Sequence, residues 1–85
     1  MEKVHYDKKY FHVKFQDGPV KVKGKNGCQT EDVLEVLIER LTDLNKRLPC
    51  RENSLALTKL QEGMHWLKAR TADRRKRGVE GTDAP

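Results

Sequence analysis

The chain has 85 residues, of which 35% are hydrophobic and 36% charged, and its formal net charge is +5 at pH 7. A chain of this length forms one domain that buries only about 60% of the surface exposed when unfolded, so self-association is a natural way to complete its core. No segment has the roughly 20 apolar residues of a membrane span, and no N-terminal apolar run indicates a signal peptide. The two cysteines lack metal-binding spacing, so we expect a reduced intracellular protein without a metal ion or a cofactor.

The positive charge lies at the two ends of the chain. Residues 1–29 carry seven lysines against three acids, and residues 69–85 carry five cations against three acids. Residues 30–68 are balanced, with six cations and seven acids. Basic ends favour an anionic partner, although a solvated basic tail explains the same distribution.

Residues 1–29 are predicted to form an N-terminal arm of strand and turns. The first nine residues are polar and irregular. Apolar and polar side chains then alternate over residues 10–15, which predicts a short, half-buried strand. The apolar side chains expected on its inner side are Phe11, Val13 and Phe15.

Two turns in the arm flank a second extended segment. Residues 16–19 form the first turn, and residues 20–23 are expected to be extended. The second turn ends in Asn26-Gly27, a pair that readily supplies a positive φ. The arm is too short to hold a core of its own.

A helical hairpin is predicted for residues 30–85. Its first helix begins with Thr30 as N-cap and is stopped by Pro49, and acids in the first turn suit the helix dipole. Leu34 and Ile38 widen the apolar stripe, so this helix is expected to meet more than one neighbour. The stripe itself consists of Val33, Leu37, Leu41, Leu44 and Leu48.

The second helix of the hairpin is predicted to begin between Arg51 and Asn53 and to end at Arg77, with Gly78 just beyond it. The short connection folds it back antiparallel on the first helix. Gly63 in its middle costs about 1 kcal/mol relative to Ala, which indicates close approach of another helix. Its packing face is expected to contain Ala56, Leu57, Leu60, Met64 and Leu67. The fold class is therefore mainly α: an antiparallel two-helix hairpin with a short strand-and-turn arm, assembled as a homo-oligomer.

Five of the eight residues from Arg70 to Arg77 are cations. Continuing the packing stripe of the second helix past Leu67 reaches Arg70, Arg74 and Arg77, and guanidiniums on such a face require acids or a bound anion. The planar fork of arginine suits phosphate. An ion-pair cluster with nearby acids explains the pattern equally well.

The remaining polar and aromatic residues favour a binding protein rather than an enzyme. The sequence has no nucleophile beside a base, no paired catalytic carboxylates and no phosphate-binding glycine-rich loop. His12 and His65 are interpreted as non-catalytic, and Trp66 as a core residue. The segment after the second helix is interpreted as a turn that lays Glu80 back near the arginines.

Several short strings of the chain resemble one phage family. They are FQDGPV at residues 15–20, then GKNG, EDVL, CREN and WL, and finally RTADR and RGVEGT, which ends at Thr82. The similarity covers residues 12–82, and CREN followed by RT-x-DR-xx-RGVEGT is too specific a combination for chance. The chain resembles the helical-hairpin domain of the Thoeris anti-defence and anti-CBASS sponge proteins.

This resemblance implies a phage protein that acts in the cytoplasm of the infected bacterium. Such proteins sequester cyclic nucleotide immune signals without cleaving them. The signals are cyclic ADP-ribose isomers and, in parts of the family, cyclic dinucleotides or trinucleotides. The resemblance also implies dimers built from the helices, often assembled further into hexamers, with ligand pockets between subunits.

The resemblance further implies a set of site residues. Asn53 lies in the CREN string, and Arg70 and Arg74 lie in the RT-x-DR string. Leu48 stands where relatives usually carry an aromatic that stacks on a base. Thoeris-type relatives carry a sizeable β domain ahead of the hairpin, where this sequence has only residues 1–15, which favours cyclic oligonucleotides. The implied ligand-binding residues are Leu48, Asn53, Arg70, Arg74, Arg77 and Glu80.

Two other functions fit the same residues. A small basic nucleic-acid binder would use both charged ends on the phosphate backbone, although the acids among the C-terminal cations disfavour it. A structural hairpin would instead use its arginines against acids of a protein partner.

Overall fold

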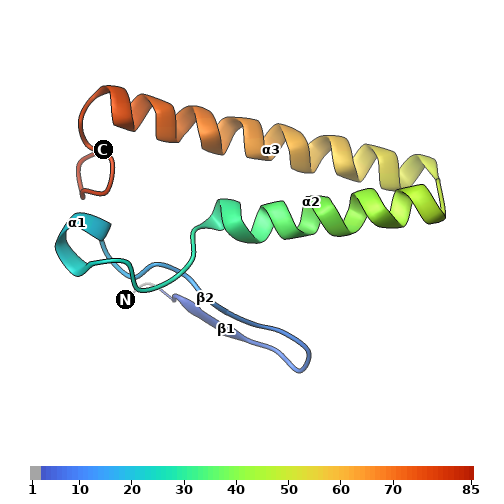
Figure 1. Cartoon of the computed structure of the whole chain (residues 1–85), viewed down its shortest axis with the longest axis horizontal. Coiled ribbons are helices and arrows are strands. Elements are labelled where there is room, and N and C mark those ends of the chain that lie inside the picture. Colours follow the sequence, from blue (N-terminus) through green and yellow to red (C-terminus); the bar gives the residue numbers. More distant parts are fainter. Residues whose placement is uncertain (1–2) are drawn as a thin grey trace.

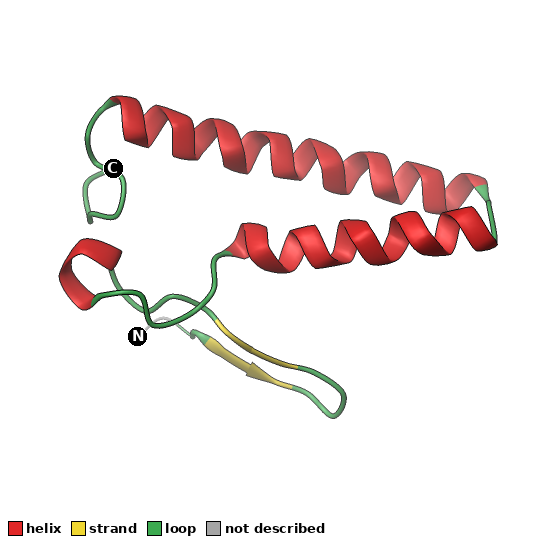
Figure 2. Ribbon diagram, viewed as in Figure 1, coloured by secondary structure: helices red, strands yellow, loops and turns green. Residues whose placement is uncertain are grey.

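The structure, a computed structural model, describes residues 3–85 and consists of a long helical hairpin with a small arm beside one of its ends (Figures 1 and 2). Neither long helix has an apolar stretch that could span a membrane. In chain order the elements are β1 (His5–Asp7), β2 (His12–Lys14), α1 (Val20–Lys23), α2 (Thr30–Arg47) and α3 (Arg51–Lys76). Predominance of the two long helices confirms the mainly α class.

The helical hairpin has the predicted bounds to within one residue, but α2 uses a different cap. Gln29 rather than Thr30 is the N-cap: Gln29 N–H donates to Asp32 Oδ2 over 2.8 Å, and Asp32 N–H donates to the backbone carbonyl of Gln29 over 3.1 Å. The sequence predicted Thr30 because threonine is the better N-cap residue when it is considered alone. The Asp32 side chain, three residues after Gln29, favours Gln29 instead. At the other end α3 is followed by Gly78, whose φ is 74° as expected for a residue just past a helix.

The connection between α2 and α3 forms the tip of the hairpin, at the far end from the arm (Figure 1). Pro49 follows the C-cap Leu48, so α2 stops there as predicted. Cys50 caps α3, and its Sγ accepts a hydrogen bond from Asn53 N–H over 3.4 Å. The Asn53 amide in turn donates to Leu48 O over 3.3 Å. Asn53 and Leu48 thus stabilise the turn.

The two long helices pack through one side of the α2 stripe. Leu34 Cδ2 lies 3.9 Å from the position that a Cβ on Gly63 would occupy, which is an ordinary van der Waals distance, so α2 contacts α3 there without an approach close enough to require a glycine. At helical spacing Ile38 and Leu41 continue the Leu34 line, and both are half-buried. Leu37 and Leu48 lie on the adjacent side and are 49% and 70% exposed. Only part of the predicted stripe is therefore covered by α3.

No side chain is fully buried anywhere in residues 3–85. Leu57, Leu60, Met64 and Leu67 are half-buried against α2, whereas Ala56 is exposed. Trp66, interpreted from the sequence as core, is 69% exposed, because its position in the helical repeat turns it away from α2. A single hairpin of this length cannot enclose a core.

The arm contains a two-stranded antiparallel sheet with His5 opposite Lys14 and Asp7 opposite His12. The expectation of irregular structure over residues 1–9 is wrong for β1, because a polar strand at the edge of a small sheet has no apolar signature. Residues 1 and 2 lie outside the described part. The strand predicted over residues 10–15 shortens to β2, and Phe15 forms a parallel bridge with Cys28.

The three apolar side chains predicted for the inner side of the strand do not all lie in the sheet. Val13 and Phe15 are half-buried, and the Phe15 ring meets Tyr6 edge to face at 5.6 Å. Phe11, with Tyr10, falls in the turn between the strands and is exposed. The alternation therefore identified the strand but placed its start too early.

Residues Val20–Lys23 form the short helix α1, not the extended segment that was expected. Pro19 has φ −65° and its carbonyl accepts from Lys23 N–H over 2.8 Å, and Gly24 N–H donates to Val20 O over 2.9 Å. Proline before the turn and a glycine with φ 73° after it set its length. Four alternating residues also fit a strand by pattern, so the sequence could not separate the two.

Candidate functional site

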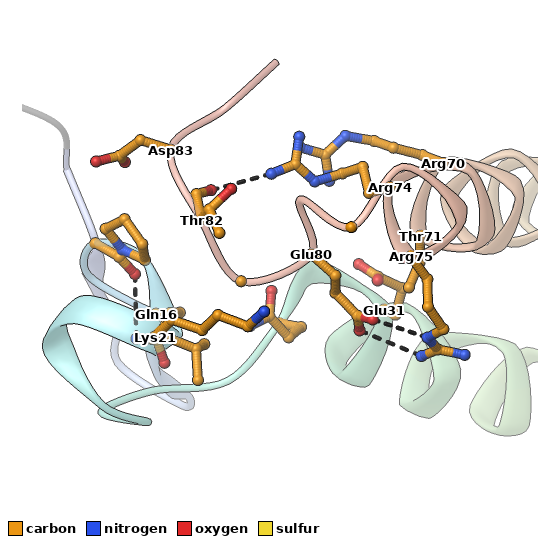
Figure 3. Close-up of a pocket in the computed structure, with 16 residues that line it drawn as sticks. Gln16, Lys21, Glu31, Arg70, Thr71, Arg74, Arg75, Glu80, Thr82 and Asp83 are labelled. Carbon is orange, nitrogen blue, oxygen red and sulfur yellow. Dashed lines mark hydrogen bonds and ion pairs between the residues drawn. The ribbon is translucent and has the colours of Figure 1, made fainter.

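A cleft of about 760 Å³ lies at the base of the hairpin, where the C-terminal end of α3 meets the arm (Figure 3). One wall comes from residues 16–21, including α1, and from the start of α2. The opposite wall comes from the last turns of α3 and from residues 78–83. Four of the lining side chains are cations, namely Lys21, Arg70, Arg74 and Arg75, and three are acids, namely Glu31, Glu80 and Asp83.

Arg74 organises the loop that forms part of this cleft. Its Nη1 donates to Ala84 O over 2.7 Å and to Pro85 O over 3.2 Å. Its Nη2 donates to Val79 O over 3.1 Å and to Thr82 O over 3.0 Å. The C-terminal segment is therefore wrapped around one half-buried guanidinium, whose charge the carbonyl dipoles only partly offset.

Arg70 lies one turn before Arg74 and lines the same cleft. Its side chain is exposed and takes part in none of the hydrogen bonds or ion pairs found within residues 3–85. Figure 3 draws its guanidinium beside that of Arg74. Within residues 3–85, Arg70 is therefore the cleft arginine whose guanidinium is not bound by another protein group and can contact an anion.

Glu80 returns to the arginines, as predicted, but its partner is Arg75. Arg75 Nε donates to Glu80 Oε2 over 2.8 Å and Nη2 donates to Oε1 over 3.2 Å, a bidentate pair (Figure 3). This bond lowers the pKa of Glu80 below its ordinary value, with smaller contributions from Lys21 and Arg74, and raises the pKa of Arg75. The pair is solvent-exposed, so it fixes geometry more than it adds stability.

Arg77 lies beside the cleft but does not line it. Its Nε donates to Asp73 Oδ2 over 2.9 Å, and its Nη2 donates to Pro85 O over 2.8 Å. The helical phase explains the difference between the three arginines. Arg70 and Arg77 lie at the edge of the α3 face that packs on α2, whereas Thr71 continues that face after Leu67.

Leu48 and Asn53 lie at the tip, away from the arginines. Asn53 and Arg70 are 17 positions apart on one helix, which corresponds to about 25 Å. Leu48 is exposed, and the Asn53 amide is engaged in the turn. Within one chain the six implied site residues therefore form two groups, one at each end of the hairpin.

Sequence reasoning did not identify Lys21, Arg75 or Gln16 as residues of the cleft. Lys21 was missed because α1 was expected to be extended, which concealed that it faces the end of α3. Its backbone N–H donates to Gly81 O over 3.0 Å and joins arm to C-terminal loop. The glycine-lysine-rich composition of residues 18–25 was the available signal, but composition does not show which wall a loop forms.

The cleft combines four cations with the acids Glu31, Glu80 and Asp83. Lys21 and Arg70 supply cationic donors from opposite walls, and the Arg75–Glu80 pair joins the end of α3 to residues 78–83 within the wall that contains Arg70. Within residues 3–85 no cluster of three metal-ligating side chains occurs. Planar guanidinium forks and the flexible ammonium of a lysine are groups that can contact phosphate oxygens.

The fold and cleft together define a helical-hairpin domain, and comparison with known families agrees. Residues 7–72 match the model of the Acb2/Tad1 hairpin domain. The chain belongs to this family, as the CREN and RT-x-DR strings indicated.

A curated relative from Bacillus phage SBSphiJ7, described as Thoeris anti-defense 1, is 51% identical over 71 residues. The aligned part is 82% of this chain and 50% of the relative. The chain therefore spans about half the length of that relative.

Proposed function

We propose that this protein is a phage anti-defence sponge that binds cyclic nucleotide second messengers without cleaving them. The observation that carries the proposal is the free guanidinium of Arg70 in a cleft also lined by Lys21 and Arg74. Family membership and the anti-defence description of the relative support it. No step of bond cleavage enters the proposal.

The ligand that best suits the cleft is a cyclic oligonucleotide. Two or three phosphodiesters in a ring present anionic oxygens in several directions, which matches cations on opposite walls. Each charge-assisted hydrogen bond contributes about 1.5–3 kcal/mol, so a few of them suffice for sequestration. Cyclic ADP-ribose isomers carry a pyrophosphate and are the second ligand class within the same proposal.

The functional unit of the proposal is an oligomer of this chain, a helix-built dimer that can extend to a hexamer. No side chain in residues 3–85 is fully buried, and Leu37 and Leu48 lie exposed on one side of α2. A second copy on this side would bury them and complete the core. An antiparallel arrangement would also bring the tip of one copy to the base of another, and so unite Asn53 with Arg70.

Calorimetric titration against a panel of cyclic dinucleotides, cyclic trinucleotides and cyclic ADP-ribose isomers tests the proposal. We expect tight binding of at least one ligand at a fixed stoichiometry, and intact ligand recovered after heat denaturation. Arg70→Ala should weaken that affinity about 30-fold or more, because it removes a charge-assisted contact. Gln61→Ala, at an exposed amide on α3, serves as the matched control.

Three results would overturn the proposal: no binding across the panel, recovery of a cleaved ligand, or equal affinity in the Arg70→Ala variant. A long DNA or RNA duplex is included to test the nucleic-acid alternative. Binding of the duplex with a logarithmic salt slope near −0.9 per phosphate contacted would favour that alternative. The sponge should ignore the duplex.

A further inference from the structure

A pair of side-chain amides holds together the loop that carries α1. The Gln16 amide donates to Gly24 O over 2.7 Å and to Gly18 O over 3.2 Å, and its Oε1 accepts from Asn26 N–H over 3.0 Å. Asn26 completes the connection, because its Oδ1 accepts from Asp17 N–H over 2.8 Å and its Nδ2 donates to Asp17 O over 2.9 Å. These two side chains, the amide clamp, tie both ends of residues 16–26 to each other.

The clamp is anchored to the small sheet of the arm. Gln16 N–H donates to Cys28 O over 2.8 Å, directly after the bridge between Phe15 and Cys28. Gly27 allows this approach, since a Cβ there would lie 2.5 Å from the backbone carbonyl group of Phe15. The Asn26-Gly27 pair thus combines a clamp amide with a close backbone contact, and Gly27 does not adopt the positive φ that the sequence suggested.

Through the clamp, the arm fixes the position of one cleft wall. The clamped loop presents α1, whose Lys21 N–H donates to Gly81 O on the opposite wall over 3.0 Å. Gly81 is closely packed there, because a Cβ on it would lie 3.2 Å from Lys21 Cγ. Lys21 also lies near enough to Glu80 to help lower its pKa. A loop of 11 residues without the clamp would sample many positions of Lys21.

We propose that Gln16 and Asn26 are positioning residues of the nucleotide site, which act by holding α1 and the Lys21 ammonium opposite Arg70. This inference rests on the proposed function, since it concerns the same cleft. When the clamp is broken, the fraction of molecules with a formed wall falls, and the apparent dissociation constant rises in proportion. The helical hairpin itself does not depend on the clamp, because the amides contact residues of the arm alone.

A double-mutant cycle with Asn26→Ala and Lys21→Ala tests the inference by calorimetry with the tightest ligand of the panel. Asn26→Ala removes both hydrogen bonds to Asp17 and should weaken binding about tenfold. In the Lys21→Ala background the same change should weaken binding less than about twofold, because the ammonium that the clamp positions is already absent. Circular dichroism and native mass should match those of the wild type, with Gln61→Ala as control.

The outcomes separate this inference from the proposed function. If the wild type binds no ligand of the panel, the proposed function fails and the positioning role with it. If the wild type binds but Asn26→Ala has no effect, or the same effect in both backgrounds, only the clamp is overturned. Faster amide hydrogen exchange at Lys21 in Asn26→Ala, with α2 and α3 unchanged, is the expected structural readout.

Discussion

The two ends of the hairpin carry the two halves of the implied site, and they differ in how one chain builds them. At the base, the arm, the end of α3 and the C-terminal loop enclose a cleft that Arg74, the Arg75–Glu80 pair and the amide clamp hold in shape. At the tip, Leu48 is exposed and Asn53 is used within a turn. In the proposed sponge the base is a site within one chain, whereas the tip would become part of a site only through another copy.

This difference separates two requirements of the proposed sponge. The first is the proposed anion contact at the base, whose side chains one copy of the chain holds in place by itself. The contribution of the tip depends on assembly, and so does closure of a core in which no described side chain is fully buried. Substitutions that affect assembly, tip and base separately should therefore have effects of different size.

The largest effect is expected for Leu37→Glu, which places a charge on the uncovered side of α2. Burying an unpaired carboxylate in an interface is very costly, so we expect loss of the oligomer and at least a 100-fold loss of nucleotide affinity. Native mass spectrometry and calorimetry measure the two quantities. Gln61→Glu adds the same charge on α3 as control. A variant that keeps the wild-type mass would show that this side of α2 is not the interface.

The sequence was sufficient to predict the hairpin because its signals are local and periodic. Pro49, Gly78 and the apolar repeat set the bounds of α2 and α3 to within one residue. Gly63 was misleading, because Leu34 Cδ2 would meet a Cβ there at an ordinary van der Waals distance of 3.9 Å. The same periodicity could not decide which side of the α2 stripe meets α3, because one chain leaves Leu37 and Leu48 of that stripe exposed.

The cleft was only partly predictable, since its walls depend on contacts between distant segments. Arg70, Arg74 and Glu80 were identified from the charge run and the resemblance, and all three line the cleft. Lys21 was not identified, because the alternating pattern of residues 20–23 fits both a strand and a single helical turn. The choice of Arg75 as the partner of Glu80 depends on the loop after Gly78, whose path no short-range pattern specifies.

A smaller effect is expected for Asn53→Ala at the tip. If the tip of one copy meets the base of another, this change should weaken nucleotide binding about tenfold, although Asn53 lies about 25 Å from Arg70 along its own helix. Loss of the hydrogen bond to Leu48 O should also lower the free energy of unfolding by about 1 kcal/mol. Calorimetry and denaturant titration measure the two changes. Asn45→Ala controls for turn stability, because it removes the hydrogen bond that Asn45 donates to Ser54 Oγ and the one that it accepts from Cys50 N–H in the same turn. Equal losses of affinity in both variants would argue against a ligand contact at Asn53.

The smallest effect is expected at the Arg75–Glu80 pair. Lowering the pH should loosen the base of the hairpin, where this pair lies, but not the tip. The pKa of Glu80 lies below its ordinary value of 4.5, so the pair holds the loop above that value and releases it as pH falls through the lowered pKa. Above the ordinary pKa of 4.5, amide exchange at Val79 should be slower in the wild type than in Glu80→Gln, and the two rates should converge as the pH falls below 4.5 through the lowered pKa of Glu80. The difference should be a few-fold at most because the pair is exposed. Exchange at Leu48, whose N–H donates to Leu44 O at the tip, should have the same ratio at every pH. Convergence at both ends would mean that acid loosens the whole hairpin rather than the base, whereas no convergence at Val79 would show that the four carbonyl contacts of Arg74 hold the loop without Glu80.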